Sequence, residues 1–302
     1  MKTKIVLLAV LSCVLGALPQ GAGAQGQTAL GWTRIERSAR ASAWAGAGAA
    51  SLNGGTYAAF AHAAQLPFQK SLGTVDAGLQ LWELSNEADN ATHISAGGGF
   101  RFGSFGVAVG GAVQLGQPIG TFKPIDRLLA VGLAYSFLDR IAVGVNFRYA
   151  VQPFTSELRV SGISLDLQVL GRITEELSAS LGVGALGPKV KGSAAEFSQP
   201  GYAKAALAWH KAFSPEHALE VVLDGDFNFD KTFGGALGAE YAYNNMLFVR
   251  AGYRLASEMA VIPSHLGLGL GVRLSGFRAD VSYLTASPVL GNTVNIGLGY
   301  SF

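Results

Sequence analysis

The sequence predicts an all-β fold: a transmembrane antiparallel β-barrel of about 14 strands with a small N-terminal segment that plugs the lumen. Three observations support this. Runs of about ten residues alternate strictly between apolar and small or polar side chains. The composition is apolar and rich in glycine, and charged residues make up 14 %, against about 25 % in a typical soluble protein. A secretory signal comes first. No stretch after residue 25 is apolar for long enough to form a transmembrane helix, whereas a membrane barrel fits all three observations.

Residues 1–24 are expected to be a signal peptide. Lys2 and Lys4 give it a basic start, residues 5–18 are apolar but too short to span a bilayer, and Ala22-Gly23-Ala24 forms a cleavage site. We expect the remaining chain to reach the outer membrane of a bacterium after cleavage.

Cys13 is the only cysteine, and it lies inside the signal. A lipoprotein signal that uses Cys13 is an alternative, but the apolar region continues past it. The chain after residue 24 has no disulfide or thiolate metal site. It carries 20 basic and 20 acidic residues, and this balance gives no indication of nucleic-acid binding.

The barrel is expected over residues 72–302. Each run has the length that a tilted membrane strand needs. The predicted strands are 72–83, 91–103, 104–115, 128–137, 140–150, 160–172, 177–187, 201–211, 217–228, 233–243, 247–256, 265–274, 276–286 and 293–302.

The apolar residues of each strand should face lipid, because hydrocarbon cannot solvate polar groups. Leu129, Val131 and Leu133 illustrate the pattern, since glycine and alanine stand between them. The last strand ends in Tyr300 and Phe302, which resemble the terminal aromatic signal that the barrel-assembly machinery recognises. This strand should close the barrel by pairing with the first, near residues 75–81.

Connections between the predicted strands alternate between short and long. With a periplasmic N-terminus, the long ones become external loops and the short ones periplasmic turns. Connections 212–216 and 229–232 fit this alternation least well. Aromatic residues near strand ends, Trp82 among them, are expected to form interfacial girdles.

Residues 25–71 are expected to form a hatch inside the lumen, with a short helix over 57–64. A disordered periplasmic leader is the alternative, but the apolar content argues against it.

Charged residues on the predicted lumen faces are expected to form an internal network that fills the barrel or anchors the hatch. A three-residue turn at 244–246 places Glu240 opposite Arg250, within reach of a cross-strand ion pair. A charged channel wall is the alternative interpretation. The predicted lumen residues are Arg148, Glu240, Arg250, Arg254, Arg273 and Asp280.

No catalytic, cofactor or metal site is predicted, and an enzyme is not expected. Asp224, Asp226, Asn228 and Asp230 alternate at a strand end and could offer oxygen ligands to calcium. Because these side chains are spread along the strand, a hydrated face is the better interpretation.

Four segments carry family-like motifs: 38–66, 185–190, 238–254 and 267–283. They resemble the PorV/PorQ family of outer-membrane proteins, which are components of the type IX secretion system and relatives of the FadL-like barrels. The resemblance implies a protein that binds the C-terminal domains of secreted cargo at the surface and works with other secretion subunits. Its partners would also include outer-membrane lipid.

Cargo binding would use apolar external loops, and the candidates are Ile119, Phe122, Pro153 and Phe154. Two other functions remain open. One is a FadL-like channel for uptake of small hydrophobic molecules. The other is a structural barrel within a larger envelope complex.

Overall fold

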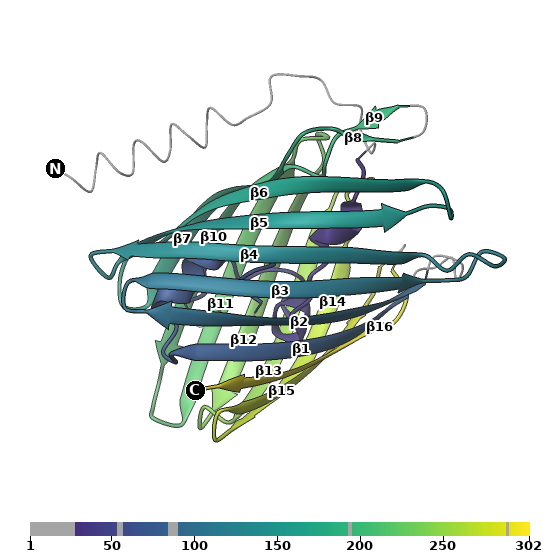
Figure 1. The fold of residues 1–302 in the computed structure, drawn as a ribbon. Helices are drawn as coiled ribbons and strands as arrows, with labels where there is room; N and C mark the ends of the chain where they lie inside the picture. Colours follow the sequence, from purple (N-terminus) through teal and green to yellow (C-terminus); the bar gives the residue numbers. More distant parts are fainter. Residues whose placement is uncertain (1–27, 53–56, 84–89, 193–194, 288–289) are drawn as a thin grey trace.

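The computed structural model describes residues 28–302 apart from 53–56, 84–89, 193–194 and 288–289. The expected signal peptide lies outside the described residues. Fourteen antiparallel strands form a closed barrel (Figure 1). They are β1 (Gly73–Trp82), β2 (Ala91–Phe102), β3 (Phe105–Gly116), β4 (Ile125–Phe137), β5 (Ile141–Pro153), β6 (Arg159–Arg172), β7 (Leu177–Leu186), β10 (Tyr202–Ala212), β11 (His217–Asn228), β12 (Phe233–Tyr243), β13 (Leu247–Ala256), β14 (His265–Leu274), β15 (Phe277–Thr285) and β16 (Thr293–Ser301).

The strand prediction is confirmed, with differences at some ends. β4 begins three residues earlier than predicted and β5 ends three residues later, because polar residues extend the ladder beyond the apolar alternation. Gln114 and Gln152 both donate to Asp126 on this extension. Leu129, Val131 and Leu133 are 64 %, 43 % and 38 % exposed, as expected for side chains that face lipid.

A two-stranded hairpin within the connection between β7 and β10 was not predicted. It consists of β8 (Val190–Lys191) and β9 (Glu196–Phe197) and lies against β6. Its strands are too short for an alternating pattern to show.

The last strand closes the barrel as predicted. β16 pairs with β1 from Val75 opposite Tyr300 to Leu81 opposite Val294. Beyond the end of β16, the Phe302 backbone accepts hydrogen bonds from Leu72 and Gly73, and its ring packs against Phe100.

Deleting Phe302 should impair closure, because it removes both the backbone groups that join the first and last strands and the ring that covers Gly73. We expect a lower yield of the folded form in the outer membrane. The measurement is the fraction of protein whose gel mobility changes on boiling. A Phe302→Tyr variant should assemble normally, and equal yields from the deletion and the parent would contradict this role.

The hatch lies inside the barrel, as the purple segments in Figure 1 show. It contains a 3-10 turn, η1 (Gly31–Arg34), one helical turn, α2 (Ala39–Ala43), and a second 3-10 segment, η2 (Ala63–Phe68). The helix expected over 57–64 is wrong: residues 57–60 form a turn and η2 begins at Ala63. Pro67 within η2 has no backbone N–H, which favours a short irregular segment over a regular helix.

Wall side chains hydrogen-bond the irregular hatch backbone. The Asn146 amide donates to the carbonyls of Ala58 and Ala59 and accepts from the Ala63 N–H. Gln168 donates to the Ala61 carbonyl. These bonds matter because a buried backbone group without a partner is costly.

Glycines on the lumen face let the hatch approach the wall closely. A Cβ on Gly252 would lie 2.6 Å from the Trp44 Cα, and one on Gly144 would lie 2.9 Å from the Ala64 Cα. The hatch therefore rests on two parts of the wall, with α2 against β13–β16 and η2 against β2–β6.

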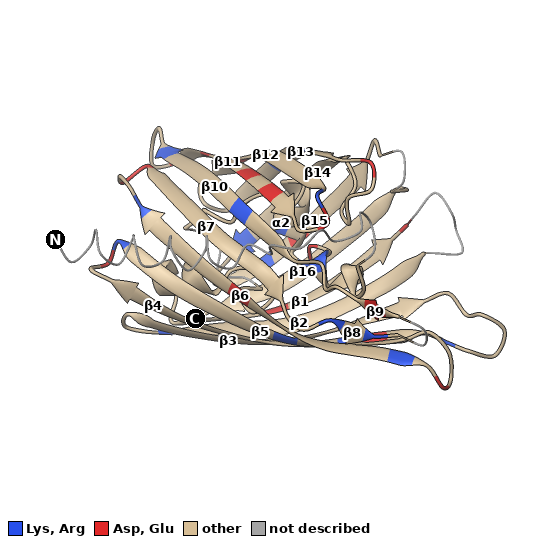
Figure 2. Cartoon of the chain, turned by 90° about the horizontal axis from the view of Figure 1, so that it is seen from above, with Lys and Arg blue, Asp and Glu red and all other residues tan. Residues whose placement is uncertain are grey.

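Charged residues gather on β10, β11 and β12 beside α2 and in the loops, whereas β3 and β4 are uncharged along most of their length (Figure 2). Within the described parts of the chain, no helix is long and apolar enough to cross a membrane.

Candidate functional site

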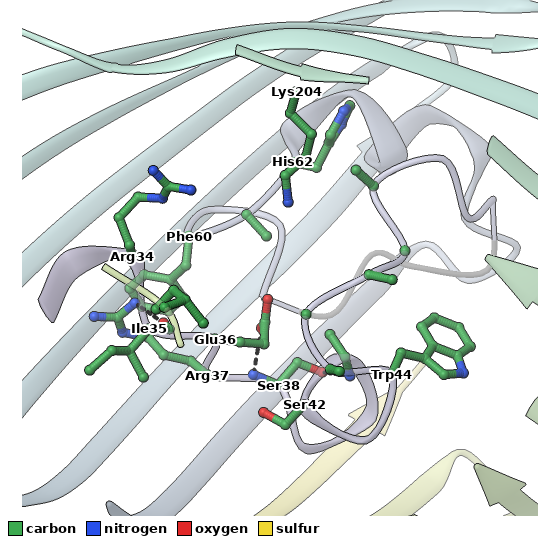
Figure 3. Close-up of a pocket in the computed structure, with 18 of the residues that line it drawn as sticks. Arg34, Ile35, Glu36, Arg37, Ser38, Ser42, Trp44, Phe60, His62 and Lys204 are labelled. Carbon is green, nitrogen blue, oxygen red and sulfur yellow. Dashed lines mark hydrogen bonds between the residues drawn. The ribbon is translucent and has the colours of Figure 1, made fainter. Parts of the chain in front are cut away.

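A chamber of about 150 Å³ lies between the hatch and the barrel wall. Figure 3 shows the hatch residues that line it, with Lys204 reaching in from β10. Trp82, His265 and Leu284 also line it, and they lie at the strand ends that carry the long loops. The chamber therefore reaches the end of the barrel that carries the long loops.

One side of the chamber is apolar and aromatic. Phe60 and Ile35 come from the hatch, and Trp82 and Leu284 from the wall. All four side chains are buried, with at most 8 % of each exposed. A molecule in the chamber would thus meet ring faces as well as polar groups.

Arg37 lies beside these rings. Its guanidinium group is 5.6 Å from the ring centroid of Trp32 and 5.4 Å from that of Phe60. It donates to the carbonyls of Thr33, Ile35 and Trp32, while its Nε has no hydrogen-bond partner. Burial lowers the pKa of Arg37 to about 10, so the side chain still carries its positive charge at neutral pH.

The neighbouring cations of the chamber are paired with carboxylates. Arg254 donates to both oxygens of Asp226, at 2.8 and 3.0 Å, and Arg34 lies 3.8 Å from the same carboxylate. Arg148 is bound to Asp166 of β6. Among the described lining residues, Arg37 is the buried cation that forms no ion pair.

His62 lies on another side of the chamber. Its Nε2 is 2.7 Å from the Ser180 hydroxyl, and its Nδ1 has no partner. Burial lowers the pKa of His62 to about 3, so the imidazole is neutral under ordinary conditions. It can offer a hydrogen bond but adds no charge.

A row of alternating charges lies closer to the short turns. Arg40 of the hatch donates to both oxygens of Glu240, at 2.9 and 2.8 Å, and to Glu220 at 3.0 Å. Glu240 also binds Arg250, which donates to Asp280 at 2.6 Å. The row continues through Arg278 to Asp76. We call Glu220, Arg40, Glu240, Arg250, Asp280, Arg278 and Asp76 the ion row.

The structure divides the predicted lumen residues between these two places. Glu240, Arg250 and Asp280 belong to the ion row, and Arg148 and Arg254 to the chamber. Arg273 joins neither by an ion pair: its guanidinium group lies 5.1 Å from the Phe248 ring centroid.

The four alternating oxygen-bearing residues of β11 and its following loop are all bound by protein groups. Asp224 accepts from the N–H groups of Gly48 and Ala49 and lies 3.5 Å from Lys204. Asn228 accepts from Arg34, and Asp230 from Thr232. This strand face thus holds the hatch through direct bonds.

The wall next to the chamber is interrupted. The ladder between β6 and β7 shifts register between Leu165 and Leu167, the only shift among the described strand pairs. Ala185 has a positive φ of 51° there, and its N–H donates to Asp166. Beyond the shift, Gln199, which follows β9, donates to the Ile163 carbonyl at 2.7 Å, so a side chain takes the place of strand pairing there.

The predicted cargo residues lie at the long-loop end. Ile119 and Phe122 form a small bridge between β3 and β4, and Ile119 is 71 % exposed. Pro153 ends β5, and Phe154 after it is 49 % exposed. The two pairs belong to separate loops.

Sequence reasoning missed the residues that make the chamber distinctive. Trp82 is wrong as a girdle residue: it is 8 % exposed and points inward. The alternation that places Leu79 and Leu81 outward was the available signal. Trp32, Arg37 and Phe60 lie in irregular hatch backbone, where no periodicity reveals a face.

No family model and no curated protein matches the chain. Its fold resembles several solved structures. A structure titled CymD monoaromatic hydrocarbon channel has a TM-score of 0.65 at 14 % identity, over 89 % of this chain and 98 % of that one. The fold is FadL-like. The Ralstonia pickettii toluene transporter TbuX has a TM-score of 0.61 at 13 % identity. A Pseudomonas aeruginosa FadL homologue has a TM-score of 0.56 at 11 % identity, and each match covers 88 % of this chain and 98 % of the other.

The chain thus has the fold of bacterial outer-membrane channels. The similar structures carry the names of channels and transporters rather than of enzymes. At these identities the likeness establishes the fold, and the chemistry of the chamber has to be argued from this chain's own residues.

Proposed function

We propose that the protein is a channel that admits small organic molecules through the outer membrane. The observation that supports the proposal is the position of the chamber next to the shifted β6–β7 ladder. Val183 of β7 and Tyr202 of β10 line the chamber there. A molecule that enters from the outside reaches the chamber while the hatch and the ion row still fill the lumen below.

The proposed exit is sideways, between β6 and the β8–β9 hairpin. Side-chain contacts hold this seam where a backbone ladder holds the rest of the wall. Gln199 bridges to the carbonyls of Ile163 and Pro188, and a Cβ on Gly162 would lie 2.8 Å from the Val190 side chain. Such contacts break more easily than a run of ladder bonds.

Joining the seam covalently should block uptake. We expect a Gly162→Cys/Val190→Cys disulfide, formed in the oxidising periplasm, to reduce uptake of radiolabelled toluene several-fold in cells that express the protein. Reduction with a membrane-permeant thiol should restore uptake. The Val190→Cys single variant is the matched control, because the mature chain has no other cysteine. Equal uptake by oxidised and reduced cells would argue against the lateral exit.

A second candidate is the PorV-like role in type IX secretion. The exposed apolar loops favour it, since Ile119, Phe154 and Met259 are 71 %, 49 % and 58 % exposed. Exposed apolar loop residues are suited to protein contacts. Deleting the gene separates the two functions: cargo retained in the periplasm supports the secretion role, and normal cargo with reduced uptake of organic solutes supports the channel.

A further inference from the structure

We infer that the chamber recognises a small aromatic carboxylate, with Arg37 and Gln80 binding the carboxylate and the surrounding rings receiving the aromatic body. This inference rests on the proposed channel function and specifies its substrate class. Two of the similar structures named above carry hydrocarbons in their titles, whereas the inference for this chain is an aromatic acid.

Arg37 supplies the positive charge. It is 4 % exposed, it lines the chamber, and it lacks the carboxylate partner that its neighbours Arg34 and Arg148 have. The nearby Glu36 carboxylate attracts the Arg37 charge through space, but it accepts a hydrogen bond from the Ser38 N–H at 2.8 Å (Figure 3) and forms no ion pair with Arg37. A buried charge normally requires a partner of opposite charge. Among the described residues, Arg37 is therefore the buried lining arginine whose guanidinium group is not already bound to a carboxylate.

Gln80 supplies further hydrogen bonds on the same side. It is 3 % exposed, it lines the chamber, and neither its Nε2 nor its Oε1 has a partner. The Arg37 carbonyl lies 3.4 Å from the Cβ position of Gly78, two residues before Gln80 on the same strand face. His93 lies opposite Gln80 in the ladder, and both of its ring nitrogens also lack partners.

Aromatic side chains enclose this polar group. Trp82 stacks on His93 with the ring centroids 6.0 Å apart, and Phe60 and Trp32 flank Arg37. A cavity of about 150 Å³ is large enough for benzene, and aromatic rings attract another ring in offset or edge-on contact. Cation, amide and rings together fit a benzoate-sized molecule better than a hydrocarbon or a dianion.

Equilibrium dialysis of the purified full-length protein in detergent tests this inference, with radiolabelled benzoate and the neutral analogue benzyl alcohol as probes. We expect saturable benzoate binding. Arg37→Met should weaken it about tenfold or more, because a charge-assisted hydrogen bond to a buried partner is lost. Arg37→Lys should retain part of the affinity. Benzyl alcohol carries no charge, so Arg37→Met should weaken its binding far less than it weakens the binding of benzoate.

Gln80→Met is the second variant, because Arg37→Met could disturb the hatch, whereas Gln80 lies on the wall. It should weaken benzoate binding several-fold without changing gel mobility before boiling. Equal binding of benzoate and benzyl alcohol to the parent, or benzoate binding unchanged in both neutral variants, would overturn the inference. Uptake of toluene by cells tests the channel separately. Toluene uptake without benzoate binding would contradict only the carboxylate site. Benzoate binding without uptake of either compound would contradict the channel function.

Discussion

Replacing Arg40 with methionine should destabilise the closed barrel by about 3–5 kcal/mol, because removal of one partner leaves buried charges uncompensated. Arg40 is 7 % exposed and binds Glu240 with both ends of its guanidinium group and Glu220 with one. Without it, the hatch loses its ion pairs to Glu220 of β11 and Glu240 of β12. The measurement is the temperature at which the folded gel band disappears, together with trypsin cleavage at the hatch arginines in detergent.

Arg273→Met is the matched control for this prediction. Arg273 lies on the same barrel wall, but it stacks near Phe248 without an ion pair and should lose much less stability. An Arg40→Met/Glu240→Gln double variant should recover part of the loss, because it also removes one of the uncompensated carboxylates. If Arg40→Met unfolds at the parent's temperature, Arg40 does not hold the hatch.

Enlarging a lumen glycine should open the barrel. In Gly252→Leu, the new side chain would occupy the space of the Trp44 backbone, whose Cα lies 2.6 Å from the Cβ position. Overpacking of this kind forces the backbone to move, and the hatch can move more easily than the laddered wall. We expect the single-channel conductance in planar bilayers to rise well above that of the parent.

Gly225→Leu is the control for the glycine variant. A Cβ at Gly225 meets no atom within 4 Å, and the residue lies on the exposed face of β11. This variant should keep the parent's conductance. A Gly252→Leu protein that folds fully and conducts like the parent would show that the hatch does not block the lumen.

The strands could be predicted because lipid imposes a strict rule on them. Every second residue must be apolar, so the sequence carries a period of two from β1 to β16. Turn length then sets the register, and the three residues after Tyr243 place Glu240 opposite Arg250. Both residues lie on adjacent strands of one hairpin, so counting residues from the turn gives their pairing.

The hatch could not be predicted in the same way. Its path depends on where wall glycines leave space and where side chains such as Asn146 accept or donate to its backbone. Neither condition produces a repeating pattern in the hatch sequence itself. The sequence around Arg40 therefore does not indicate that Arg40 lies between Glu220 and Glu240. Nor does the sequence around Arg37 indicate that Arg37 forms no ion pair.

The ion row also constrains the order of biogenesis. Arg40 and Glu240 are 200 residues apart in the chain, and contacts between such distant residues form late because the intervening loop must first be closed. Arg40 is translated and exported before every carboxylate it will meet. The hatch therefore cannot form its ion pairs with the wall until β11 and β12 have been added to the growing sheet. Fixing the hatch inside the lumen is thus among the last events of assembly.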